Sequence, residues 1–567
     1  MAELVSNTDT NSQANVRGYI DYMYCNGLVV GTLNSGNSRC SYQTASHVPF
    51  AHNLYEFKQR SFANVVELCP LFNKLVHNVA NDYDYLVDAL AVTAKSDDFT
   101  KRLLGIMRTV VSNGGEFEQQ TIALGILRSD YMVHAAGAGE AQEESLKQVE
   151  INTIASSFGV LSTRLTTMQH HFYPALAPRA GDPLDELDSP GAGLAETIPN
   201  NDPLSKMTAG IAKAHYTYLQ QTGTPATGIG VGGCVVLMIV QPNERNIADQ
   251  RPLEHLLRSK YSIRLVRATL QEVHEHGCLQ EARVTGSGFD GSEGSDGAKA
   301  VQELRLWGTA VSVVYFRGGY TPTDYTGEEQ WAARLLMERS YAIKCPSISY
   351  HLAGCKKIQQ TLATAAAGPL DEKNILTSRF GLTSEEIEQL RSVFTGLYSL
   401  DPTETGSDAL TALKLRVAAR PQDFVLKPQR EGGGNNIYGA DIVTTLDRMG
   451  QEELNAHILM DRIVPPMQRC MLVKDNTSMD VHNCICEIGI YGIYLNALSR
   501  LYTRGAVSEP SDHSPCGSPT PQRVREARQR PIINTYGGYL LRVKPSDVDE
   551  GGVASGFGVL GVIKLAK

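Results

Sequence analysis

Apolar residues at helical spacing alternate along the chain with short runs of β-branched residues. The helical pattern begins near Leu54 and is clearest over Leu86–Val110, where it predicts an amphipathic helix or a helix pair. Thr383 and Glu386 form a capping box, which predicts a helix beginning directly after them. The further predicted helices are Leu204–Gln221, Gln250–Ser259, Glu328–Ala342 and Ile387–Leu397.

The β-branched runs predict strands, several of them too apolar to face water on either side. These strands are Gln148–Asn152, Val231–Val240, Tyr261–Ala268, Thr309–Phe316, Asp423–Lys427, Val481–Leu495 and Val559–Leu565; the segment Ile122–Val133 is left without an assigned element. Strands and a helix alternate over 231–316, which indicates an α/β subdomain. Residues 173–203, 280–300 and 504–530 are rich in loop-forming residues, and we assign them no function.

Composition narrows the class of protein. The 567 residues are 42% hydrophobic, enough for one large core or for two to three packed domains. A net charge of −9 argues against general nucleic-acid or anionic-membrane binding. No apolar stretch has the length of a membrane span, and the polar N-terminus is not typical of a secretory signal. The 11 cysteines are dispersed without zinc-site spacing, which favours a cytoplasmic location.

A glycine-rich run, Lys-Pro-Gln-Arg-Glu-Gly-Gly-Gly-Asn-Asn, spans residues 427–436. Three consecutive glycines allow the backbone to approach a ligand closely and to aim N–H groups at an anion. Lys427 could neutralise a phosphate, and Glu431 could hold Mg²⁺. The run matches neither a Walker loop nor a GxGxxG motif. On these residues alone, a phosphate-binding loop and a flexible surface turn both remain open.

Polar residues in the strand at 148–152 and directly after it form a second candidate site. Glu150 and Asn152 share one face of that strand, with Ser156 and Ser157 close behind. Two oxygen donors on one face suit a hard cation such as Mg²⁺. A solvent-facing polar edge is the alternative interpretation.

Three arginines near turns form the third candidate. Arg128, Arg317 and Arg542 could together bind a substrate that carries several carboxylates, because a guanidinium binds a carboxylate through two hydrogen bonds. Each could equally be a surface or ion-paired arginine. The glycine-rich stretch 550–556 could act as a lid that excludes water, or it could be a simple turn before the final strand.

In combination, these segments resemble the eukaryotic-type glutathione synthetases, which are ATP-grasp ligases. The similar stretches occur in the family's order and are Arg128–Tyr131, Glu150–Phe158, Asn243–Arg251, Tyr315–Tyr320, Trp331–Gln360, Phe424–Gly439, Ile458–Ile463, Glu487–Tyr494 and Leu540–Gly556. The resemblance implies an α/β fold of α+β subdomains: a circularly permuted ATP-grasp fold with an inserted α/β substrate-binding domain and mobile lid loops. It places the N-terminal part of the ATP-grasp domain at 1–231, the insert at 232–355 and the C-terminal part at 356–567. It also implies a homodimer.

The family's roles carry over to matching positions in this sequence. The resemblance implies catalytic roles for Arg542, Lys356 and Lys427, and metal ligands at Glu150, Asn152 and Glu431. The implied ATP-binding residues are Glu150, Lys356, Lys427, Glu431, Gly432, Gly433, Gly434, Asn435, Asn436, Tyr438, Met460, Asp461, Arg462, Ile463, Glu487 and Lys544. The implied substrate-binding residues are Arg128, Ser156, Ser157, Glu244, Arg245, Asn246, Gln250, Arg317, Tyr320, Arg542, Val553 and Ala554.

The activity that the resemblance implies is ligation of γ-glutamylcysteine and glycine, with ATP as co-substrate and two Mg²⁺ ions. An acylphosphate intermediate is expected, with no nucleic-acid or membrane partner. The tail reads Val-Ala-Ser-Gly at 553–556 where relatives have Val-Ala-Ala-Gly, and Asp461-Arg462 replaces the family's Glu-Lys. A sibling ligase that uses β-alanine or serine, a non-catalytic homologue and a kinase are the alternatives; no HRD or DFG motif supports the kinase.

Overall fold

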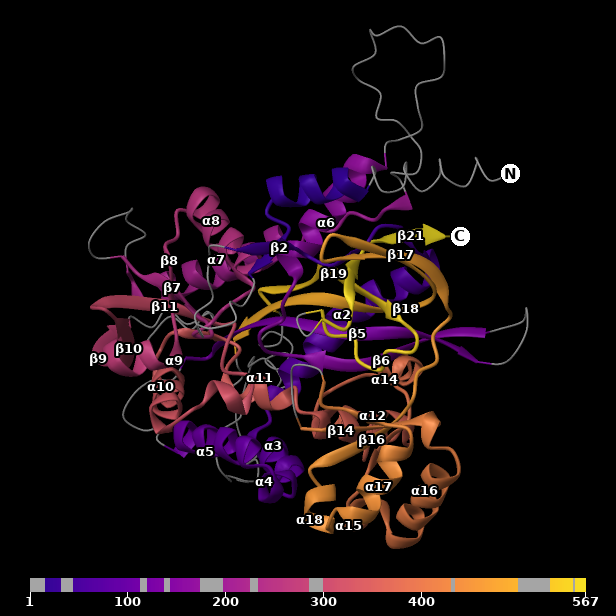
Figure 1. Ribbon diagram of the computed structural model, residues 1–567. Helices are drawn as coiled ribbons and strands as arrows, with labels where there is room; N and C mark the ends of the chain where they lie inside the picture. Colours follow the sequence, from indigo (N-terminus) through magenta and orange to yellow (C-terminus); the bar gives the residue numbers. More distant parts are fainter. Residues whose placement is uncertain are drawn as a thin grey trace, which may run out of the picture.

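The structure is a computed structural model with mixed α/β architecture and several sheets (Figure 1). It describes residues 16–31, 44–112, 120–136, 143–173, 197–224, 233–284, 299–429, 434–497, 531–553 and 556–566. Within these ranges no helix combines the length and the apolar character needed to cross a membrane. The predicted loops near 173–203, 280–300 and 504–530 fall largely outside the described residues.

A seven-stranded sheet in the order β17-β3-β20-β19-β18-β5-β6 forms the centre of the molecule. Its strands are β17 (Gln468–Lys474), β3 (Phe50–Ala51), β20 (Val559–Gly561), β19 (Ile533–Pro545), β18 (Thr477–Ala497), β5 (Ile122–Ala136) and β6 (Glu143–Asn152). The long strands β18 and β19 come from the last fifth of the chain and pair with each other, and β18 also pairs with β5. Segments far apart in sequence therefore supply adjacent positions on one surface.

Helices cover both faces of this sheet. One core contains apolar residues of α2, α3, α5, α11, α12 and α14, and a second contains residues of α6 and α7. The helices of this part are α2 (Gln59–Ala80), α3 (Tyr83–Leu90), α4 (Thr93–Ser96), α5 (Asp98–Ser112), α6 (Gly159–Phe172), α7 (Pro203–Thr222), α11 (Ile348–Ala353), α12 (Lys356–Ala367), α13 (Ile375–Ser378) and α14 (Ser384–Val393). Alternation along the strands sends successive side chains to opposite cores, which fixes the register.

A second sheet lies to the left of the central sheet in Figure 1. It has the order β8-β7-β11-β10-β9, with β12 also paired to β11. Its elements are β7 (Val235–Ile239), α8 (Ile247–Tyr261), β8 (Leu265–Ala268), α9 (Leu270–His276), β9 (Gly277–Val284), β10 (Lys299–Leu306), β11 (Thr309–Phe316), α10 (Glu328–Arg339) and β12 (Ile343–Cys345). Strands β7, β8, β11 and β12 pair in parallel, as expected where helices connect them.

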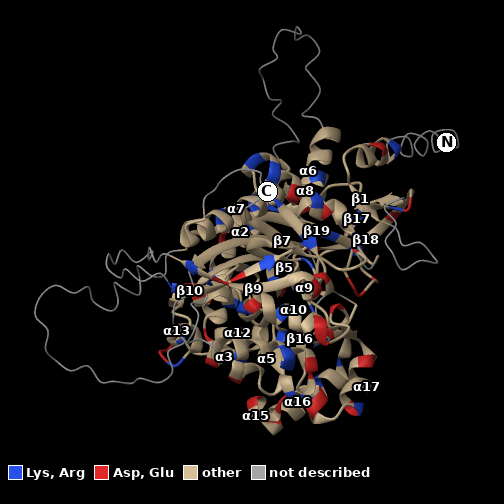
Figure 2. Cartoon of the chain, turned by 90° about the vertical axis from the view of Figure 1, so that its left-hand side faces the viewer, with Lys and Arg blue, Asp and Glu red and all other residues tan. Residues whose placement is uncertain are grey.

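A four-stranded antiparallel sheet in the order β13-β16-β14-β15 lies at the bottom in Figure 1, with its own small core. Its elements are β13 (Leu397–Ser399), α15 (Pro402–Thr405), α16 (Ser407–Ala419), β14 (Phe424–Pro428), β15 (Ile437–Tyr438), α17 (Ala440–Arg448), α18 (Gln451–Leu454) and β16 (His457–Asp461). These helices carry both acidic and basic residues, which are coloured along the ribbon in Figure 2. Two short pairs complete the sheets: β1 (Val29–Gly31) with β2 (Ala45–His47), and β4 (Tyr55–Lys58) with β21 (Ile563–Ala566).

The secondary-structure predictions are largely confirmed. The strand predicted at Thr309–Phe316 is β11, and the helical stretch predicted at Leu86–Val110 is helical but divided among three helices, α3 to α5, not one or two. The predicted capping box is present at α14, where Thr383 accepts from the backbone of Glu386. Several boundaries differ: α10 and α14 end earlier than predicted, α8 and β6 begin earlier, the strand beginning at Tyr261 starts only at Leu265, and the final strand is divided into β20 and β21.

Candidate active site

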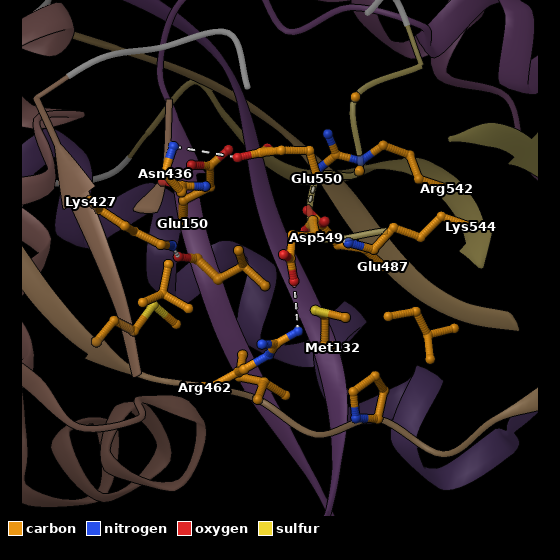
Figure 3. A pocket seen from close by; sticks show the side chains of 18 of the residues that line it. Met132, Glu150, Lys427, Asn436, Arg462, Glu487, Arg542, Lys544, Asp549 and Glu550 are labelled. Carbon is orange, nitrogen blue, oxygen red and sulfur yellow. Dashed lines mark hydrogen bonds and ion pairs between the residues drawn. The ribbon is translucent and has the colours of Figure 1, made fainter. Parts of the chain in front are cut away.

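A cavity of about 560 Å³ lies where the central sheet meets the four-stranded sheet. Strands β5, β6, β18 and β19 supply its floor, and β14 and β16 supply the facing wall. The loop after β19 lies over it (Figure 3). A cavity of this size, with charged groups converging on it, is typical of a small-molecule site.

Strand register assembles the floor of the cavity. Glu487 of β18 lies opposite Arg542 of β19, and Arg128 of β5 lies opposite Asn152 of β6. Asp130 lies opposite Glu150 on β6 and opposite Gly489 on β18. Neighbouring strands place such opposed residues within reach of one another, so four strands bring their charges to one place.

Two lysines meet Glu150 at the facing wall. Lys356, the first residue of α12, lies 3.0 Å from the Glu150 carboxylate. Lys427 on β14 donates a hydrogen bond to the Val149 carbonyl at 2.9 Å. Burial alone would raise the pKa of Glu150, but Lys356, Lys427 and Arg542 hold it well below its usual range. Burial lowers the pKa of Lys427, against the opposing charge of Glu150. This wall therefore presents cations suited to phosphate.

Two arginines and two carboxylates pair on the floor. Arg128 donates to Asp130 through Nε at 2.7 Å and Nη2 at 2.8 Å. Arg542 donates through Nη2 to Asp130 at 2.8 Å and also to Glu487. Burial raises the pKa of Glu487, and Arg542 opposes that rise. Opposite charges thus balance where water is largely excluded.

Polar contacts link the loop after β19 to the facing wall. Asp549 accepts from Arg462 at 2.8 Å, and Glu550 accepts from the Asn436 backbone N–H at 3.3 Å (Figure 3). Apolar side chains line the same part of the cavity; they are Met132, Val149, Val425, Met460, Ile463, Val464, Met467 and Ile485. An apolar slot next to cations can hold a planar base with its phosphates.

The turn after β6 is held from the second sheet. Ala155 and Phe158 have positive φ values of 53° and 73°, which are uncommon for residues with side chains. Asp249 accepts the backbone N–H of Phe158 at 2.8 Å, and Arg317 donates to Asp249 at 2.9 Å. Arg317 also donates to the Ser157 hydroxyl at 3.1 Å. The buried Arg317–Asp249 pair therefore fixes a turn that lines the cavity.

Most of the residues expected in the site line this cavity. They are Arg128, Glu150, Asn152, Ser156, Ser157, Tyr320, Lys356, Lys427, Asn435, Asn436, Tyr438, Met460, Asp461, Arg462, Ile463, Glu487, Arg542, Lys544 and Val553. The expected residues that do not line it are Gly434, Glu244, Arg245, Asn246, Gln250 and Arg317. Glu431, Gly432, Gly433 and Ala554 lie outside the described residues.

The expected residues Glu244 to Gln250 form a separate polar cluster. Glu244 accepts from Gln250 at 2.5 Å, and Arg267 donates to Gln250 at 2.6 Å. Arg245 donates instead to the Gly31 carbonyl at 3.2 Å. This cluster is linked to the second sheet through Arg267 on β8.

Sequence reasoning missed Asp130, Asp549 and most of the apolar lining, of which it had named Met460, Ile463 and Val553. Asp130 lies within the quoted run Arg-Ser-Asp-Tyr, but only strand pairing shows that it meets Arg542. Asp549 precedes Glu550 in the tail loop, and its partner Arg462 is 87 positions away. No local pattern signals such contacts.

The side-chain oxygen atoms that the structure describes here are compatible with ligands of a magnesium ion. Asn152 directs its amide nitrogen to Asp130 at 3.0 Å and to Glu150 at 3.3 Å, so its amide oxygen is the atom left to bind a cation. Glu150 stays ionised, and oxygen ligands of this kind suit Mg²⁺. The described residues hold no group of three acidic, His or Cys side chains placed to bind a metal. Phosphate oxygens and Glu431 would have to complete the set.

Comparisons with known proteins agree across the chain. Residues 9–565 match the family described as "Eukaryotic glutathione synthase, ATP binding domain". The chain is 35% identical to a glutathione synthetase of Dictyostelium discoideum, over 95% of this chain and 96% of that protein. It is 35% identical to the Homo sapiens glutathione synthetase, over 86% and 84% respectively, and 36% identical to a chloroplastic one of Arabidopsis thaliana, over 95% and 83%. A solved glutathione synthetase-like effector of Globodera pallida shares the fold, with a TM-score of 0.64 at 16% identity over 98% of this chain and 97% of that one.

Proposed function

The chain belongs to the eukaryotic glutathione synthase family, and on that premise we propose that its cavity joins γ-glutamylcysteine to glycine at the expense of ATP. The chain is an ATP-dependent ligase that forms a peptide bond in glutathione synthesis. The observation that carries this proposal is the convergence of Lys356, Lys427, Glu150 and Arg542 on one cavity. Three cationic side chains around the Glu150 carboxylate provide positive charge for the triphosphate of ATP and for a second anionic substrate beside it.

ATP binds between the two facing sheets. Its base enters the apolar slot beside Met460 and Ile463, while Lys356 and Lys427 neutralise the phosphates. Lys544 lies close to Glu487 and Glu550, and burial lowers its pKa against those charges. Glu431 and the glycines Gly432–Gly434 would cover the phosphates, as the sequence predicts.

The reaction proceeds in two transfers. An oxygen of the cysteinyl carboxylate attacks the γ-phosphorus of ATP. The bond between that phosphorus and the oxygen bridging to the β-phosphate breaks, which releases ADP and forms an acylphosphate. The glycine amine then attacks the acyl carbon, loses a proton and displaces phosphate. Arg542 on the floor is placed to steady the carboxylate and the oxyanion that develops from it.

Magnesium, held by Glu150, Asn152 and Glu431, would neutralise phosphate charge during the transfer. The amide orientation of Asn152 and the ionised state of Glu150 support this assignment. Two ions per site remain the expectation taken from the family.

The dipeptide binds at the edge of the cavity that faces the second sheet. Arg128 and Tyr320 line that edge, with the turn that carries Ser156 and Ser157. Arg317 supports that turn through Ser157 and Asp249. The Glu244–Gln250 cluster remains part of the proposed substrate site, farther from the cavity.

The finer architecture also belongs to the proposal. We retain a circularly permuted ATP-grasp fold divided at 1–231, 232–355 and 356–567, with mobile lid loops and a homodimer. Cytoplasmic location also stays a prediction, and one relative is described as chloroplastic.

Coupled ADP release tests the function. γ-Glutamylcysteine and ATP are supplied with glycine, β-alanine or serine, and glycine should give the fastest release. If release does not depend on glycine, the proposed reaction is refuted; faster release with β-alanine or serine would identify the sibling ligase. Glu431→Ala should abolish turnover without changing the thermal midpoint, and retained activity would refute its place in the metal site.

A further inference from the structure

Asp130 accepts four hydrogen bonds beneath the site, although it does not line the cavity. Its side chain is 0% exposed, and it accepts from three different residues. Arg128 contributes two of these hydrogen bonds, Arg542 one at 2.8 Å and Asn152 one at 3.0 Å. The Asp130 carboxylate is thus hydrogen-bonded to Arg128, to Arg542 and to the amide of Asn152. Arg542 is placed to steady the reacting carboxylate, and Asn152 belongs to the proposed metal site.

The sheet is built to accommodate this carboxylate. Gly489 lies opposite Asp130 on β18. A Cβ at Gly489 would lie 2.6 Å from Asp130 Oδ1 and 2.8 Å from Arg128 Cδ, closer than real contacts allow. The Asp130–Arg128 pair therefore occupies the space that a side chain on β18 would otherwise fill.

We propose that Asp130 is a positioning residue that holds these two arginines and one amide in a single arrangement. It holds the Nη2 of Arg542, which also donates to Glu487, so that the rest of the guanidinium is left for the reacting carboxylate. It also draws the amide nitrogen of Asn152 away from the cavity, so that the oxygen remains for the cation. The second part rests on the proposed function, because the metal-binding role of Asn152 comes from the family.

Geometry explains why a carboxylate is needed. Four N–H donors converge on two oxygens, and an amide at this position would offer only one acceptor oxygen. In Asp130→Asn the new NH₂ group would meet a donor in either orientation: Arg128 Nε at the place of Oδ1, or the Nη2 atoms of both arginines and the Asn152 amide at the place of Oδ2. In the second orientation the Asn152 amide can relieve its own clash by turning over, which would point its nitrogen at the cation.

The first experiment measures ADP affinity by calorimetry with and without Mg²⁺, together with kcat. Asp130→Asn should lower the Mg²⁺-dependent gain in ADP affinity and kcat by about 10–100-fold each, the usual cost of losing a residue that orients a metal ligand. ADP affinity without Mg²⁺ should stay the same. The matched control is Glu338→Gln, since Glu338 is a buried carboxylate that pairs Arg334 at 3.0 Å outside the cavity. The control should lose thermal stability but keep both readouts.

A second variant keeps the inference testable if Asp130→Asn fails to fold. Asn152→Asp adds a negative charge, which by itself should strengthen Mg²⁺ binding. It also places an oxygen 3.0 Å from Asp130, where the amide nitrogen now lies. If Asp130 orients this residue, repulsion should weaken the Mg²⁺-dependent gain.

The outcomes separate the positioning role of Asp130 from the proposed function. A full Mg²⁺ gain in Asp130→Asn, or a larger gain in Asn152→Asp, overturns the role of Asp130 and leaves the ligase assignment intact. Absence of any Mg²⁺ gain in the unaltered protein overturns the proposed metal site, and with it the role of Asp130 in orienting Asn152.

Discussion

Arg542→Lys is the sharpest single test of the floor of the cavity. Arg542 uses Nη2 to reach Asp130 at 2.8 Å and Glu487, which lie on different strands. A lysine keeps the positive charge, but its compact ammonium does not reproduce the planar fork of a guanidinium. We expect the lysine to stay with one carboxylate and to leave the other without a cation.

The size of the effect follows from these contacts. Loss of one hydrogen bond between charged groups should lower the free energy of unfolding by about 1.5–3 kcal/mol. The arginine side chain is only 15% exposed, so water compensates little for this loss. If the guanidinium also stabilises the developing oxyanion, kcat should fall by roughly 10²–10³-fold. The pKa of Glu487, already raised by burial, should rise further, which moves the acid limb of the kcat profile to higher pH.

Steady-state ADP release from pH 5 to 9 and thermal denaturation check both parts. Arg334→Lys is the matched control, because Arg334 is 0% exposed and pairs Glu338 at 3.0 Å away from the cavity. Both variants should lose stability, and only Arg542→Lys should lose kcat. A kcat of Arg542→Lys within about threefold of the unaltered protein would refute the transition-state role.

The remaining predictions concern stability and loop closure. Burial lowers the pKa of Lys344 to about 8, so the unfolded state binds more protons than the folded state between pH 8 and 10.5. The free energy of unfolding should therefore rise with pH across that window. Urea titrations should show a flatter rise for Lys344→Met. Asp549→Asn removes the half-exposed ion pair with Arg462, which contributes about 0.2–1 kcal/mol. Stopped-flow measurements should therefore show ADP release about twofold faster at low salt and unchanged at high salt, where the ion pair is screened. Gly492→Ala places a Cβ 2.0 Å from Asn73 Oδ1 and should lower the free energy of unfolding by about 1–3 kcal/mol in urea, while an unchanged midpoint would contradict this packing.

Local pattern predicted the elements well and their ends less well. The helix expected to reach Ala342 ends at Arg339, because residues from Ile343 pair in parallel with β11. The helix expected to reach Leu397 ends at Val393, because Leu397 joins β16 across the four-stranded sheet. In each case a partner strand distant in sequence sets the boundary, and periodicity carries no information about that partner.

The same distinction applies to the site. The run at 427–436 and the pair Glu150 and Asn152 were candidates from residue type and spacing, with a surface turn and a polar edge as the alternatives. Asp130 was not, because its importance arises from facing β18 and β6 at once. Met460 and Ile463 were expected only through the family resemblance, and the rest of the apolar slot was missed for a related reason: methionine, valine and isoleucine at its wall have the same sequence signature as core residues.

Charge balance explains why the site is spread over so much of the chain. A buried charge is costly unless a partner lies beside it, and the floor satisfies this by alternating cations and anions across adjacent strands. Asp130 shares its carboxylate between two arginines, and Arg542 shares its guanidinium between two carboxylates. Such sharing requires β5, β18 and β19 to be in register, although β5 ends more than 340 residues before β18 begins. No short motif could place these charges, which is why the family likeness extends over residues 9–565 and is not confined to the glycine-rich run.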